Sequence, residues 1–129
     1  MDLIKPGDHG STYGGNPLGM AVSRVAIQTL IEEGMIENSE KMGTLFLELL
    51  KEIKNPLIKD VRGKGLFAAI ELKQKDKIKV DANDLAYILQ KNGMLCKSTH
   101  DHTIRFAPPL IIDKDSIARA AMKVRRSLT

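Results

Sequence analysis

Cysteine, aromatic side chains and long apolar runs are all scarce in this sequence of 129 residues. Cys96 is its only cysteine, so no disulfide bond can form within the chain. No run of apolar residues approaches the roughly 18 that a membrane-spanning helix needs, so we expect no membrane partner. The first ten residues also lack an apolar stretch, and we therefore expect no secretory signal.

A strong excess of either charge is missing as well. Lysine and arginine number 20 against 16 aspartates and glutamates, and the basic residues are spread out except for Lys123, Arg125 and Arg126. Nucleic-acid binding calls for a basic face with aromatic side chains that stack on bases. Because aromatic residues make up only 4% of the chain, we expect no nucleic-acid partner.

Ligand sets for a metal ion are not found at useful spacing. The histidines are His9, His100 and His102, and no cysteine or carboxylate set accompanies them. Cys96 stands in an apolar segment and is expected to lie in the core or to be half-buried there. We expect no metal site, and spacing supports no Ser-His-Asp or Cys-His arrangement.

Helical periodicity dominates the first half of the sequence. Asn16-Pro17 suits a helix start, because asparagine caps a helix and proline fits its first position. A helix is therefore predicted over 18–33, with Gly34 as its stop. A second helix is predicted over 36–54 and ends before Asn55-Pro56. Its apolar stripe consists of Met42, Leu45, Phe46, Leu49, Leu50 and Ile53.

The apolar pattern then changes to an alternation typical of strands. In segment 61–72 the apolar residues Leu66, Ala68, Ile70 and Leu72 alternate, which predicts a strand preceded by a glycine-bracketed turn over 62–65. Two further short strands are predicted over 94–97 and 103–106, joined by a polar turn over 98–102.

Two more helices complete the expected fold. Asp81 or Asp84 can cap a helix that Gly93 ends, and Asp113 can cap a final helix. The apolar face of that final helix consists of Ile117, Ala121, Val124 and Leu128. This order predicts an α/β fold of the α+β layer type, a short, mostly antiparallel sheet with helices on one face.

The glycine-rich segment 9–17 has the features of an anion site. Its glycines allow a ligand close to the backbone, Ser11 and Thr12 offer hydroxyl donors, and a helix N-terminus follows directly. The pattern matches neither the P-loop nor the dinucleotide fingerprint. A flexible linker that ends in a helix cap explains the same residues, and the sequence alone leaves both interpretations open.

Arg105 is the second candidate, because it stands in an apolar strand where a charge needs a partner. Its guanidinium could bind the carboxylate of a ligand through two parallel hydrogen bonds. It could equally be an edge-strand arginine that pairs with a structural carboxylate. Segment 62–65 could also be a basic anion-binding loop, although a tight turn is the simpler interpretation.

Three runs resemble one known family. HGSTYGGNPLG at 9–19 resembles the glycine-rich motif of the class III aminotransferases, which use pyridoxal phosphate. VRGKGLFAAIEL at 61–72 is similar to the strand that opens their small domain. KSTHDHTIRFAPPLII at 97–112 resembles the matching segment of the ornithine aminotransferases within that family. The resemblance covers nearly the whole chain in order.

The resemblance implies a domain arrangement. The fold would be the C-terminal small domain of the fold-type I pyridoxal-phosphate transferases. Residues 1–17 would be a phosphate-contact loop from the large domain, 18–54 connecting helices, and 55–129 the small domain itself.

The resemblance also implies residue roles. Ser11 and Thr12 match positions that reach the cofactor phosphate of the neighbouring subunit, so a homodimer is implied. Arg105 matches the arginine that binds the carboxylate of glutamate or 2-oxoglutarate. The lysine that holds the cofactor precedes the glycine-rich loop in the family, and no lysine here matches it. We therefore expect no catalytic residue in this chain, and no activity from the chain alone.

The implied reaction moves the δ-amino group of ornithine to a 2-oxo acid, giving glutamate-5-semialdehyde and an amino acid. Acetylornithine and 4-aminobutyrate are alternative amino donors within the family. A non-catalytic module that binds an anion or a partner subunit is the alternative from another class. We expect a cytoplasmic location, with the mitochondrial matrix as the alternative.

Overall fold

The computed structural model describes residues 3, 5, 7–73 and 81–128, which form two compact units divided after Gly34. Each unit is described by itself. Their elements are α1 (Pro17–Glu32), α2 (Met35–Lys51), β1 (Ile58–Lys64), β2 (Phe67–Leu72), α3 (Ala82–Lys91), β3 (Lys97–Thr99), β4 (Thr103–Phe106) and α4 (Lys114–Ser127). None of the helices among the described residues is long and apolar enough to cross a membrane.

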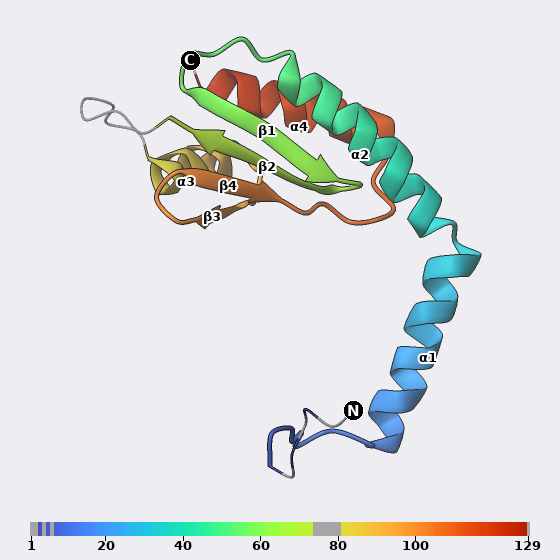
Figure 1. Ribbon diagram of the computed structural model, residues 1–129. Helices are drawn as coiled ribbons and strands as arrows, with labels where there is room; N and C mark the ends of the chain where they lie inside the picture. The colour runs from blue at the N-terminus through green and yellow to red at the C-terminus, as the bar shows by residue number, and fades with distance from the viewer. Residues whose placement is uncertain (1–2, 4, 6, 74–80, 129) are drawn as a thin grey trace. The chain divides into compact units, whose positions relative to one another are not determined.

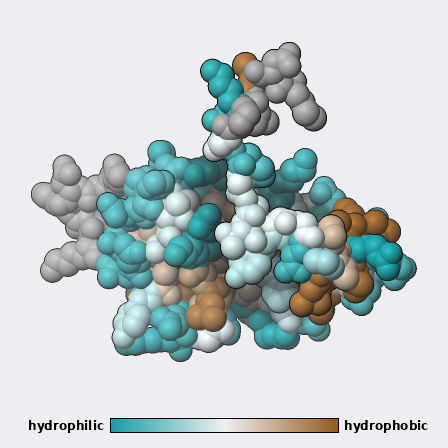
Figure 2. Space-filling view, turned by 90° about the horizontal axis from the view of Figure 1, so that it is seen from below, coloured by the Kyte–Doolittle hydropathy of each residue, from teal (hydrophilic) through white to brown (hydrophobic). Residues whose placement is uncertain are grey.

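The first unit consists of the glycine-rich segment and α1. Asn16 caps α1 through its side chain, which accepts hydrogen bonds from the amides of Leu18 and Gly19, and Pro17 is the first helical residue. The predicted helix start is confirmed, and Gly34 follows the helix with a φ of 61°. α1 buries none of its residues. Figure 2 shows exposed hydrophobic residues of the molecule in brown.

The second unit is an antiparallel sheet with the strand order β1-β2-β4-β3. Figure 1 shows α2 and α4 behind this sheet, with α3 beside β4. Every second residue of β2 and β4 is buried under the helices, among them Ile70 and Ile104, both 0% exposed. The expected fold class, with helices on one face of a short antiparallel sheet, is confirmed.

The core lies between this face and the three helices. α2 and α4 contribute the apolar stripes that their sequences predict, α3 contributes Ala82, Leu85 and Leu89, and Asp81 and Asp113 cap the last two helices. α2 ends at Lys51, three residues earlier than predicted, yet Ile53 is still buried. The buried residues are Met42, Phe46, Leu50, Ile53, Leu66, Ala68, Ile70, Leu72, Ala82, Leu85, Leu89, Ile104, Phe106, Ile117, Ala121, Val124 and Leu128.

The predicted turn over 62–65 is wrong, because most of it belongs to a strand. Arg62, Gly63 and Lys64 end β1, and only Gly65 and Leu66 form the turn into β2. Gly63 pairs with Ala68, and a Cβ on Gly63 would lie 2.5 Å from the Phe67 carbonyl oxygen. This glycine therefore permits two strands to approach closely and does not form a turn.

The predicted strand over 94–97 is misplaced, since β3 covers Lys97–Thr99. The cause is the end of α3. Gly93, with a φ of 71°, donates its amide to Gln90, and the Met94 amide donates to the Leu89 carbonyl. This pair of bonds is a Schellman cap. The Met94 amide is therefore bonded to the helix end and is not available for a hydrogen bond within the sheet.

A glycine contact joins α2 to the β1–β2 turn. A Cβ on Gly43 would lie 2.0 Å from the carbonyl carbon and oxygen of Gly65, so only glycine fits at this point of the helix. Gly65 has a φ of 52°, and Ser39 Oγ accepts a hydrogen bond from the Leu66 amide beside it. The helix backbone therefore rests directly on the turn.

We expect Gly43→Ala to lower the free energy of unfolding by about 1–3 kcal/mol or more, because the added methyl group would overlap fixed backbone atoms. Urea unfolding monitored by circular dichroism measures this change. Thr44→Ala, at the next and exposed position of α2, is the matched control. Equal stability of the two variants would show that the backbone at Gly43 and Gly65 can move apart without cost and would contradict this expectation.

Candidate functional site

The sheet face opposite the helices carries a row of cationic side chains. Arg62 on β1, Ala69 on β2, Arg105 on β4 and Lys97 on β3 are successive partners across the ladder. Because paired residues point to the same face of a sheet, these side chains lie together on the face without helices. Arg105 and Lys97 have like charges on directly paired positions, an arrangement that an anion would relieve.

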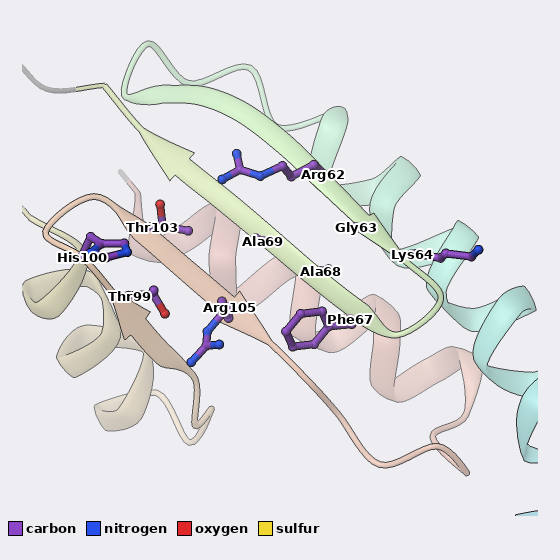
Figure 3. Close-up of a pocket in the computed structure, with 10 residues that line it drawn as sticks. All are labelled: Arg62, Gly63, Lys64, Phe67, Ala68, Ala69, Thr99, His100, Thr103 and Arg105. Carbon is purple, nitrogen blue, oxygen red and sulfur yellow. The ribbon is translucent and has the colours of Figure 1, made fainter. Parts of the chain in front are cut away.

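A hollow of about 400 Å³ lies on this face. Ala69 has the smallest side chain in the row, and it leaves space between Arg62 and Arg105. Figure 3 shows the Phe67 ring and the Arg105 side chain over the hollow, with Thr99 near Arg105 and Lys64 pointing away. The hollow is lined by Arg62, Gly63, Lys64, Phe67, Ala68, Ala69, Thr99, His100, Thr103 and Arg105.

Arg105 lies on an inner strand, between β2 and β3. The alternative of an edge-strand arginine is therefore wrong. The side chain is half-buried, its Nε atom is buried without a hydrogen-bond partner, and no ion pair forms between Arg105 and a carboxylate in the described part of the chain. A buried guanidinium nitrogen without a partner is costly, so the side chain is suited to receive an anion.

Thr99 is a residue of the hollow that sequence reasoning missed. The sequence pattern predicts it in a polar turn, whereas the structure places it at the end of β3, opposite Thr103. Its Oγ1 atom is buried and has no hydrogen-bond partner. His100 follows with a φ of 51°, the only positive φ among the described residues other than glycine. No feature of the sequence alone distinguished this threonine.

Arg62 is neutralised by carboxylates, unlike Arg105. Its Nη1 atom lies 2.8 Å from Asp60 Oδ2 and 2.7 Å from Glu71 Oε2, and Glu71 also accepts from Lys59. Hydrogen bonds from Lys59 and then from Arg62 hold the pKa of the Glu71 carboxyl below its usual value. Since Arg62 is paired and Lys64 points away, segment 62–65 does not form an anion-binding loop.

Ser11 and Thr12 belong to the first unit, whereas Arg105 belongs to the second. The side chains of Ser11 and Thr12 are exposed. The Asn16 carboxamide already accepts from the Leu18 and Gly19 amides at the start of α1. An anion in this loop would therefore depend on the hydroxyl groups more than on the helix end.

His9, His100, His102 and Cys96 are of the residue types that commonly bind metal ions. Among the described residues no three His, Cys, Asp or Glu side chains are grouped closely enough to hold a metal ion. Cys96 is half-buried and immediately precedes β3, and burial raises the pKa of its thiol.

Comparison with known families assigns the chain to one family. The family model for aminotransferase class III matches residues 1–128. The chain belongs to the class III aminotransferases. In this family context, the hollow around Arg105 and the loop with Ser11 and Thr12 are the two candidate binding elements of the chain.

Similar proteins within the class III aminotransferases include ornithine and acetylornithine enzymes. The ornithine aminotransferase of Staphylococcus carnosus is 48% identical over 126 residues, which are 98% of this chain and 30% of that enzyme. The solved structure of ornithine aminotransferase from Plasmodium yoelii has a TM-score of 0.87 at 42% identity, over 99% of this chain and 34% of that one. The acetylornithine aminotransferase from Elizabethkingia anophelis has a TM-score of 0.84 at 40% identity, over 99% and 34%. The chain thus spans about a third of the length of these relatives.

We expect the contribution of Glu71 to the free energy of unfolding to be lost at acid pH. Because its folded pKa is lowered, its contribution is fully present above the ordinary value of 4.5 and is lost as the pH falls through the lowered pKa. The stability advantage of the unaltered chain over Glu71→Gln should therefore shrink below pH 4.5. Urea unfolding across this pH range tests it, with the exposed Glu48→Gln as control. A constant difference between chain and variant would contradict the assignment.

Proposed function

We propose that this chain is the C-terminal part of an ornithine aminotransferase. The reaction transfers the δ-amino group of ornithine to 2-oxoglutarate and gives glutamate and glutamate-5-semialdehyde. The proposal is supported by relatives named as ornithine aminotransferases, which match at 45–48% identity over nearly the whole chain. The observation that carries it is the Nε atom of Arg105, which is buried without a hydrogen-bond partner among the described residues and belongs to a side chain that lines the hollow.

In this proposal Arg105 binds a carboxylate of 2-oxoglutarate. A guanidinium offers a planar fork of donors that matches a carboxylate, and its charge does not change with pH in the working range. The surrounding strands hold the backbone of Arg105 on both sides, so its side chain is positioned by the sheet. Phe67 and Ala69 supply apolar walls beside the charge, which suits the methylene groups of a dicarboxylate.

The residues present also fit pyridoxal phosphate, the cofactor of this reaction. The exposed hydroxyl groups of Ser11 and Thr12 would hold its phosphate, and a Cβ on the neighbouring Gly10 would meet open space, so a ligand can approach the backbone there. When bound, the cofactor supplies an electron sink for the carbon that loses a proton. We propose that this contact reaches the cofactor of a second subunit, as in a homodimer, and that the protein is cytoplasmic.

A second candidate function is transamination of acetylornithine, which the similarity to the Elizabethkingia anophelis enzyme favours. The two functions share cofactor and acceptor, so they differ only in the amino donor. A chimeric enzyme, here called the graft, distinguishes the two candidate functions. In this graft the chain replaces the 126 matched residues of the Staphylococcus carnosus ornithine aminotransferase.

We expect the graft to turn over ornithine with 2-oxoglutarate at a higher kcat/KM than acetylornithine or 4-aminobutyrate. A coupled assay of glutamate formation measures all three donors. The isolated chain is the control, and it should give no turnover, because the lysine that holds the cofactor has no counterpart in it. Preference of the graft for acetylornithine would overturn the proposed donor, and turnover by the isolated chain would overturn its proposed dependence on a larger protein.

We expect Thr12→Val in the graft to raise the Kd for pyridoxal phosphate by about tenfold or more, since a hydrogen bond to a charged group is lost. Thr12→Ser should retain tight binding, because the hydroxyl stays. Titration of the cofactor-free graft, followed by absorbance, gives these constants. An unchanged Kd in Thr12→Val would remove Thr12 from the phosphate site.

A further inference from the structure

Two polar atoms in the hollow have no partner. Among the described residues, Thr99 Oγ1 and Arg105 Nε are the only buried side-chain nitrogen or oxygen atoms without a hydrogen bond. Both residues line the same hollow. An unsatisfied buried polar group is rare in folded proteins, because it loses its bonds to water and gains none. The presence of two such atoms in one hollow indicates that both form hydrogen bonds with a ligand when it binds.

The ladder places these side chains beside each other. Thr99 on β3 pairs with Thr103, and Lys97 pairs with Arg105, so Thr99 and Arg105 are diagonal neighbours on the same face. Diagonal neighbours in an antiparallel pair lie about 7–8 Å apart, which is within reach of a long side chain such as arginine, so both side chains can reach one shared ligand. Figure 3 shows the Thr99 side chain near the guanidinium of Arg105.

The residues on either side of Thr99 hold its side chain on the face with the hollow. β3 ends at Thr99, and His100 takes a φ of 51° at the turn toward β4. Ser98, on the opposite face, donates its Oγ hydrogen to Asn83 Oδ1 of α3 at 2.6 Å. Because side chains alternate along a strand, this bond to α3 directs the next residue, Thr99, to the hollow.

We propose that Thr99 is a second carboxylate-binding residue of the acceptor site. Its hydroxyl donates to the carboxylate that Arg105 binds, and its side chain turns about the Cα–Cβ bond to reach the ligand. This inference rests on the proposed function, because the carboxylate is that of the 2-oxo acid. The charge of Arg105 supplies attraction, whereas the single hydroxyl of Thr99 fixes the orientation of the carboxylate.

The test compares Thr99→Val, which keeps the shape of the side chain and removes the donor, with Thr99→Ser, which keeps the donor. Both are made in the graft, and the two half-reactions are measured separately. We expect Thr99→Val to raise the KM for 2-oxoglutarate about tenfold, through the loss of one hydrogen bond to a charged group. Thr99→Ser should stay close to the parent. Neither variant should change the KM for ornithine.

Thr44→Val, on the exposed side of α2, is the control for general effects of the substitution. An unchanged KM for 2-oxoglutarate in Thr99→Val overturns the role of Thr99 and leaves the proposed function intact. An equal rise in Thr99→Ser and Thr99→Val also overturns it, because the residue would then act through packing. A parent graft without any turnover is a failure of the proposed function, and this inference fails with it.

Discussion

The alternation of side chains along β2 and β4 is the constraint on which the second unit depends. Helices cover only one face of the sheet, so every second residue of these strands enters the core. The residues between them, Ala69 and Arg105, must then face the other side. A shift of the register by one residue would place Arg105 in the core and Ile104 in the hollow. Core packing therefore also determines where the candidate binding residue points.

Much of this fold could be predicted from the sequence, because the apolar positions state the periodicity of each element. The stripe of α2, the caps of α3 and α4 and the alternation of β2 all agree with the structure. β1 could not be predicted, because its side chains are mostly polar and its Gly63 is typical of a turn. Only the close approach of the Phe67 backbone explains why a glycine stands in this strand.

The candidate site was predicted in part. Arg105 attracts notice because a charge interrupts an apolar strand, yet only the strand order shows that the strand is an inner one. Thr99 carried no signal, since a threonine between polar residues is ordinary in a turn. The roles of Ser11 and Thr12 rest on resemblance to the class III aminotransferases. The structure adds that the Asn16 side chain already accepts from two amides at the adjoining helix end.

The proposed function depends above all on the binding of the 2-oxo acid carboxylate by Arg105. Its most direct test is the affinity of the graft for 2-oxoglutarate when Arg105 is replaced by glutamine. We expect the affinity to fall by about thirtyfold or more, because a carboxylate loses its charged partner, and we expect the ornithine half-reaction to be unchanged. Equal affinity for 2-oxoglutarate in Arg105→Gln and the parent graft would contradict it.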